Sequence, residues 1–92
     1  MEISVKIVYK NEKLQAARKA AGMSQSQLAS AAGGSVRLLQ DYERGGRDIN
    51  GAKLITLLRL CNAMGCSLGD ILNDEDTIKQ LEDYEQKSEG KK

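Results

Sequence analysis

The segment from residue 24 to residue 46 constrains the fold most, because it holds two short amphipathic stretches separated by glycines. Ser24 and the glutamine three residues after it have the spacing of a reciprocal capping box, which predicts a helix over about 25–32. Ser35 can cap a second helix that runs through Arg44, and the paired glycines after it are typical of a helix end. Two helices joined by a tight turn are therefore expected.

Small and apolar residues within this segment predict how the two helices pack. Ala29 is small enough for a close approach of the helices, and Gly33 accepts a turn conformation that a side chain would resist. The inward positions that hold the pair together are Leu28, Ala32, Leu39 and Tyr42. This joint spacing is typical of a helix-turn-helix, whose second helix can enter the major groove of DNA.

Two longer helices are predicted on either side of this pair. The first spans about 11–21 and ends at Gly22, with one face made of Leu14, Ala17, Arg18 and Ala21. The other is capped by Asn50 and ends at Gly65, with inward residues Leu54, Leu57, Leu58, Cys61 and Met64.

A fifth, short helix is predicted to close the core. Ser67 and Asp70 repeat the capping pattern, and Ile71 and Leu72 follow as apolar residues. Residues 11–72 are therefore expected to form one compact, five-helix, all-α domain.

The first ten residues have a different pattern from the rest of the chain. Residues 1–10 alternate apolar and polar side chains, which is typical of a half-buried strand, with Ile3, Val5, Ile7 and Tyr9 on one side. No other segment offers a partner strand. The strand is expected to pair with the same strand of a second chain, to lie on the helices as an extended arm, or to be partly disordered.

Residues 73–92 form an acidic, mostly polar tail. Ile78, Leu81 and Tyr84 recur at every third position, which predicts an additional helix over about 75–86. Its acidic first turn suits the positive end of a helix dipole. The last six residues are expected to be disordered.

Composition limits the chemistry of the chain. With 92 residues, of which 40% are apolar, one small domain is expected. The chain has no histidine, and the spacing of its residues brings no nucleophilic side chain next to a general base. No enzymatic reaction is therefore predicted. Cys61 and Cys66 cannot complete a four-ligand zinc site, so they are interpreted as small core residues, and no cofactor is expected. No membrane helix or signal peptide is predicted, and a cytoplasmic location is expected.

Charge is distributed unevenly along the chain. Residues 1–72 hold ten Lys and Arg against six Asp and Glu, whereas residues 73–92 hold four against seven. A body of +4 suits contact with a polyanion such as DNA, and a tail of −3 does not.

The stretch from Leu14 to Leu72 resembles the Cro and lambda-repressor family of XRE-type helix-turn-helix DNA-binding domains. The residues that carry the resemblance are Leu14, Arg18, Gly22-Met23-Ser24-Gln25, Leu28-Ala29, Gly33, Ser35, Leu39, Glu43-Arg44-Gly45, Leu57-Leu58-Arg59-Leu60, Ala63-Met64-Gly65, Ser67-Leu68 and Ile71-Leu72. The resemblance implies a transcriptional regulator, in most cases a repressor, that binds a palindromic operator on double-stranded DNA as a homodimer. Antitoxins and adaptor proteins share the domain, so the alternative is a protein-interaction module that uses the amino-terminal strand or the acidic tail to bind a protein partner.

The predicted helix over residues 35–44 has an outward face that is expected to meet DNA. At 100° per residue, Arg37, Asp41 and Arg44 lie opposite Leu39 and Tyr42, with Val36 and Gln40 at the margin. Arg37, in the first turn, is the leading candidate for base contact, because its guanidinium can donate two hydrogen bonds to a guanine.

The other three base-contact candidates have weaker chemical arguments. Val36 can pack on a thymine methyl group, and Gln40 can bond a base or a phosphate. Asp41 lies four residues after Arg37, where it can orient that arginine, accept a hydrogen bond from cytosine, or form a surface ion pair.

The resemblance also implies phosphate contacts and a structural ion pair. The phosphate-contact candidates are Gln25, Ser35, Arg44, Arg47 and Lys53. In the family, the positions of Arg18 and Glu43 form an ion pair that ties the first helix to the third.

The chain departs from the family pattern at the turn and in a loop. Gly34 occupies a place where the family commonly has an apolar residue, and Leu38 is apolar at the border of the exposed face. The stretch between Gly45 and the end of the fourth helix is about three residues longer than usual for the family.

Overall fold

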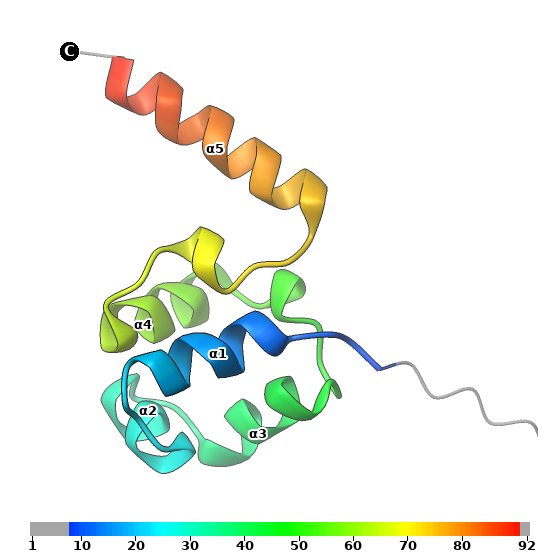
Figure 1. The fold of residues 1–92 in the computed structure, drawn as a ribbon, viewed down its shortest axis with the longest axis vertical. Coiled ribbons are helices and arrows are strands. Elements are labelled where there is room, and N and C mark those ends of the chain that lie inside the picture. The colour runs from blue at the N-terminus through cyan, green and yellow to red at the C-terminus, as the bar shows by residue number, and fades with distance from the viewer. Residues whose placement is uncertain (1–7, 91–92) are drawn as a thin grey trace, which may run out of the picture.

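The computed structural model describes residues 8–90, and the whole of this part is helical or irregular (Figure 1). The order of elements is α1 (Glu12–Ala20), α2 (Gln25–Ala31), α3 (Val36–Arg44), the 3-10 turn η1 (Ile49–Gly51), α4 (Leu54–Met64), the 3-10 turn η2 (Leu68–Asp70) and α5 (Glu75–Gly90). The all-α prediction is confirmed. The predicted fifth helix is a single 3-10 turn, and the predicted additional helix is α5.

The core lies where α1, the α2–α3 pair, α4 and η2 meet (Figure 1). Four side chains in it are fully buried, and each comes from a different part of the chain: Leu14, Leu28, Ile49 and Ile71. Burying a Leu or Ile side chain stabilises a fold by about 1.5–3 kcal/mol, so burial at each of these positions contributes to the stability of so short a domain. The packing fixes α3 on one side of the body, with its outer face open.

The ends of α2 and α3 form as the serine and glycine pattern predicts. The Ser24 hydroxyl accepts a hydrogen bond from the Gln27 backbone at 3.1 Å, and the Gln27 side chain accepts one from the Ser24 backbone at 2.8 Å. The Ser35 hydroxyl accepts hydrogen bonds from two backbone N–H groups in the first turn of α3. Gly45 ends α3 with φ +84°, a conformation that favours glycine.

The predicted amino-terminal cap of α4 is wrong. Asn50 does not cap the helix: Asp48 caps the intervening turn η1, and α4 begins only at Leu54. The Asn50 side-chain oxygen instead accepts hydrogen bonds from the backbone of Asn73 and Asp74, at 2.9 and 3.0 Å. The predicted cap is thus used to fix the segment that leads into α5.

This later start sets which residues of α4 face the core. Leu57, Leu60 and Cys61 are buried, whereas Leu54 and Leu58, predicted to point inward, are exposed. The strongly apolar sequence of α4 does not define the inward face, because leucine or isoleucine covers more than half of the circumference of this helix.

The two ends of the described chain behave differently. The backbone N–H of Tyr9 donates to the Gly45 carbonyl at 2.9 Å, so residues 8–10 pass along the end of α3 with no strand assigned. The rest of the predicted strand, residues 1–7, lies outside the described residues. At the other end α5 runs to Gly90, so the expected disorder of residues 87–90 is wrong, and residues 91–92 again lie outside the described part.

Only the beginning of α5 packs on the body. The Asp74 carboxylate accepts a hydrogen bond from the Thr77 backbone at 2.9 Å, and Ile78 and Leu81 lie partly buried against the core. Beyond them the helix points away from the other elements (Figure 1), and Tyr84 is exposed.

The two cysteines are both free thiols in this structure. Burial, followed by the neighbouring Cys66, raises the pKa of Cys61 to about 12, so this thiol stays protonated at neutral pH. Within the described residues, no group of three or more His, Cys, Asp or Glu side chains could hold a metal ion. Over the same stretch no helix is both long enough and apolar enough to cross a membrane.

Candidate nucleic-acid interface

Helix α3 has one buried face and one exposed face. Leu39 and Tyr42 are buried in the core, whereas Val36, Arg37 and Gln40 are exposed. Arg44 is exposed as well, at the carboxyl end of the helix. The structure therefore places the candidate base-contact residues on the outer surface, with the half-buried Asp41 beside them.

Arg37 lies in the first turn of α3. Its backbone N–H donates a hydrogen bond to the Ser35 hydroxyl at 3.2 Å. Its guanidinium makes no ion pair or side-chain hydrogen bond with any residue in the described part of the chain. The five N–H donors of an arginine that is not paired can be offered to an external acceptor without breaking an internal bond.

Asp41 forms ion pairs at the other end of the helix. Its carboxylate contacts the Arg44 guanidinium directly, and its Oδ2 lies 3.6 Å from Nε of Arg47. The contact with Arg37 considered from the sequence is not formed within residues 8–90. Because both arginines are largely exposed, these pairs contribute at most about 1 kcal/mol to stability. Their effect is to gather two basic side chains where α3 ends.

Arg18 of α1 and Glu43 of α3 form a bidentate ion pair beneath this surface. Arg18 donates from Nε at 2.8 Å and from Nη2 at 2.9 Å to the two carboxylate oxygens. A third donor, Nη1, reaches the Met23 carbonyl at 2.9 Å. Only 10% of the Arg18 side chain and 3% of the Glu43 side chain are exposed. The hydrogen bond to Glu43 raises the pKa of Arg18 above its usual value, although burial acts in the opposite direction.

Gln25 connects this ion pair to the outer face of α3. Its side-chain nitrogen donates to Glu43 Oε1 at 3.3 Å, and its oxygen accepts a hydrogen bond from Gln40 at 3.4 Å. Both bonds are long, so they orient the side chains weakly. A continuous polar chain nonetheless runs from Arg18 through Glu43 and Gln25 to Gln40 on the surface.

The remaining two phosphate-contact candidates have simpler surroundings. Ser35 is exposed, and its hydroxyl is already used to cap α3. Lys53 is exposed immediately before α4, and no hydrogen bond or ion pair joins its side chain to the rest of the site in the described chain.

Asn11 is a residue whose role the sequence did not reveal. It precedes α1 and is 3% exposed, and its amide donates to the carbonyls of Tyr42 at 2.7 Å and Arg47 at 2.6 Å. It thereby fixes the end of α3 and the loop that carries Arg47. The pattern showed only that the periodicity changes at this residue, and a buried asparagine with two backbone partners leaves no local signal.

Comparison with known proteins identifies the family to which a chain with this pair of helices, α2 and α3, belongs. Residues 14–71 match the helix-turn-helix family. The chain therefore belongs to the XRE-type helix-turn-helix family of DNA-binding transcription regulators.

Two solved structures are similar to this chain. One is the restriction-modification controller protein C.AhdI from Aeromonas hydrophila, at 28% identity and a TM-score of 0.59, covering 70% of this chain and 92% of that one. The other is the clp gene regulator ClgR from C. glutamicum, at 25% identity and a TM-score of 0.58, covering 74% and 84%. A comparison with curated proteins gave no match.

Proposed function

We propose that this protein is a repressor that binds a palindromic operator as a homodimer, with α3 in the major groove. The observation that carries the proposal is Arg37, which stands in the first turn of α3 with its guanidinium unpaired within the described residues, while the opposite face of the helix is buried. First-turn residues of a recognition helix contact base edges. Such a regulator acts on double-stranded DNA in the cytoplasm, performs no reaction and needs no cofactor.

Base contacts are assigned to four residues of α3. Arg37 donates two hydrogen bonds to guanine O6 and N7, and Val36 packs on a thymine methyl group. Gln40, at the end of the polar chain from Arg18, bonds a base edge or a phosphate. Asp41 accepts from a cytosine amino group only if Arg44 and Arg47 turn towards phosphates, because they occupy its carboxylate in the structure without DNA.

Phosphate contacts are assigned to the ends of the two helices. Arg44 and Arg47 are held together by Asp41 where α3 stops, which supports their contact with one stretch of backbone. Gln25 and Ser35 stand at the first turns of α2 and α3, where N–H groups and the positive end of the helix favour an anion. Lys53 is the outermost member of the set.

Replacing Arg37 by alanine is expected to weaken binding to the specific operator about 5- to 150-fold, because the bidentate base contact is worth about 1–3 kcal/mol. Binding to scrambled DNA changes far less. The measurement is fluorescence anisotropy with the DNA that flanks the protein's own gene and with a scrambled duplex, each at two salt concentrations.

Arg47→Ala serves as the matched control, since it removes a phosphate contact. It is expected to weaken binding to both duplexes alike and to lower the salt dependence by about one unit of slope. Equal losses on specific and scrambled DNA for Arg37→Ala would contradict the assignment of Arg37 to base contact. No preference of the parent protein for its own flanking DNA would contradict the proposed function itself.

The interface of the homodimer is assigned to an exposed apolar patch on α4, formed by Leu54, Ile55 and Leu58. These side chains are 62%, 51% and 40% exposed, and they lie within about 100° of one another around the helix. Exposed apolar residues clustered in this way are typical of contact surfaces. A second copy is the occupant that a palindromic operator requires, because an isologous interface matches the two-fold symmetry of the DNA.

Ile55→Glu is expected to convert the dimer into a monomer, since it places a carboxylate within the patch. Sedimentation equilibrium should then give the 10.0 kDa of one chain and not twice that mass. Gln86→Glu, which adds the same charge on exposed α5, is the control and should remain dimeric. A dimer of unchanged stability in Ile55→Glu would place the interface elsewhere.

A further inference from the structure

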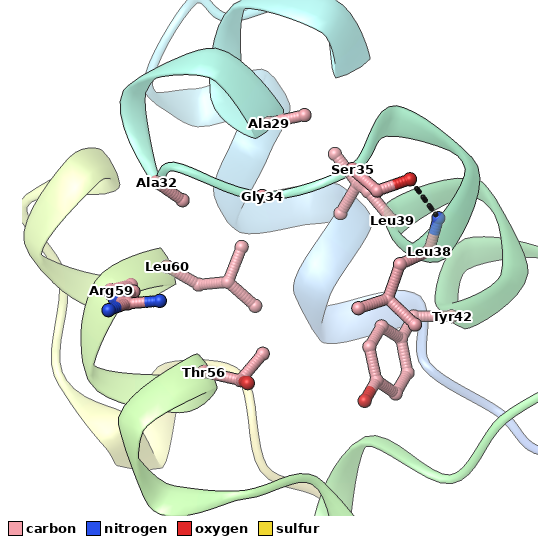
Figure 2. A pocket seen from close by; sticks show the side chains of 10 residues that line it. All are labelled: Ala29, Ala32, Gly34, Ser35, Leu38, Leu39, Tyr42, Thr56, Arg59 and Leu60. Atoms are coloured by element: carbon pink, nitrogen blue, oxygen red, sulfur yellow. Dashed lines mark hydrogen bonds between the residues drawn. The ribbon is translucent and has the colours of Figure 1, made fainter.

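A cavity lies behind the helix-turn-helix, between the end of α2, the turn, the inner side of α3 and α4. Its volume is about 180 Å³, and apolar side chains make most of its wall (Figure 2). Ala29 and Ala32 line it from α2, Leu38 from α3 and Leu60 from α4. A cavity of about 150 Å³ with walls of this kind is large enough to bind benzene, so this one accepts a single ring with a small substituent.

The turn contributes an exposed glycine to the rim of the cavity. Gly34 lines it, and a Cβ added there would meet no atom within 4 Å. This is the position at which the family resemblance implies an apolar side chain. In this chain that space is left open.

Four residues with polar side chains also line the cavity, and one of them, Ser35, already uses its hydroxyl to cap α3. Tyr42 is only 7% exposed, and Thr56 and Arg59 come from α4. Figure 2 marks one hydrogen bond among the lining residues, from the Leu38 backbone to Ser35, and none to the Tyr42 hydroxyl, to Thr56 or to Arg59. Arg59 also makes no ion pair within residues 8–90. Apolar walls with a few convergent polar groups are typical of small-molecule sites.

We propose that this cavity binds a small aromatic carboxylate. The ring takes the space beside Gly34, among the alanines of α2 and Leu60. The carboxylate accepts hydrogen bonds from Arg59, whose planar guanidinium matches the geometry of a carboxylate. A hydroxyl donor, Tyr42 or Thr56, completes the site. The cavity volume suits a ligand of this size better than a drug-sized molecule, which needs about 300 Å³ or more.

The test is an NMR titration of the ¹⁵N-labelled full chain with sodium benzoate, and with neutral benzamide as the uncharged analogue. Benzoate is expected to cause saturable shifts at the amides of Ala29, Ser35 and Leu38, at a concentration about tenfold lower than benzamide requires. Arg59→Gln should remove the difference between the two compounds. Lys79→Gln, which removes an exposed cation on α5 outside the cavity, should leave it unchanged.

Gly34→Leu should abolish the binding of both compounds, because the new side chain fills the space of the ring. Gly34 does not have a positive φ, so a side chain there adds no backbone strain. Shifts that are scattered or not saturable, or equal affinity for benzoate and benzamide in the parent, would overturn the proposal even if Gly34→Leu did not fold. The titration contains no DNA, so its failure leaves the proposed function untouched.

Discussion

Replacing Arg18 by methionine is expected to lower the free energy of unfolding by about 3–5 kcal/mol, the cost of leaving a buried charge without its partner. The Glu43 carboxylate is 97% buried when Arg18 is present, and both of its oxygens accept hydrogen bonds from this one guanidinium. The change also leaves the Met23 carbonyl without the Arg18 donor. Small domains are stable by only about 5–15 kcal/mol, so a loss of this size removes a large share of the total. Urea unfolding followed by circular dichroism measures it.

Two further variants separate the buried charge from other effects of the substitution. Lys19→Met changes an exposed basic residue on the same helix and should alter stability by less than about 0.5 kcal/mol. The double variant Arg18→Met with Glu43→Leu removes both charges and should recover most of the lost stability, because apolar pairs can replace buried ion pairs. If the free energy of unfolding of Arg18→Met lay within about 1 kcal/mol of that of the parent protein, Glu43 would have found another partner or reached water.

Replacing Asn11 by alanine is expected to cost about 2 kcal/mol or more, since two carbonyls lose their donor. The carbonyls are those of Tyr42 and Arg47, and Asn11 itself is buried, so water cannot readily replace the amide. Asn11→Asp should cost more than the alanine change, because it places a carboxylate of the same shape against two carbonyl oxygens. Thermal unfolding at neutral pH compares the two variants.

Asn62→Ala is the matched control for this comparison, since Asn62 is exposed on α4. It should leave the unfolding temperature nearly unchanged. If Asn11→Asp were as stable as the parent protein, the two hydrogen bonds would contribute nothing and the end of α3 would be fixed by other contacts.

Most of the fold follows from local patterns that can be read along the chain. Ser24 and Ser35 form the predicted caps, and Gly45 and Gly65 end their helices in the left-handed conformation. A capping hydrogen bond spans two or three residues, so the sequence holds both partners side by side. At both of these serines the helix start was predicted correctly to within a residue.

Several errors arose where the deciding partner lies far away in the sequence. Asn50 has the chemistry of a cap, but its acceptor oxygen is used 23 and 24 residues later, at Asn73 and Asp74. The inward face of α4 depends on where the preceding turn stops, and a helix with apolar residues on all sides does not indicate it. Asn11 was missed for the same reason, because its partners are 31 and 36 residues away.

The candidate site was predictable as a surface and less so as a set of contacts. Helical periodicity identified the outward residues of α3, because Leu39 and Tyr42 mark the buried side. The partner of Asp41 was not predictable in this way. Helical spacing puts Arg37 and Arg44 within reach of its carboxylate, but the structure pairs it with Arg44 and with Arg47 from the loop after Gly45.

The direction of α5 has a practical consequence for how the protein can be labelled or immobilised. The helix leaves the body on the side away from α3 (Figure 1), so a fluorophore or a surface linker at its far end stands clear of the DNA-binding face. Residues 8 and 9 offer no such freedom, since Val8 and Tyr9 pass directly against Gly45 at the end of α3. A bulky group attached to either of these two residues lies close to the place where Arg44 and Arg47 meet the phosphates in the proposed complex.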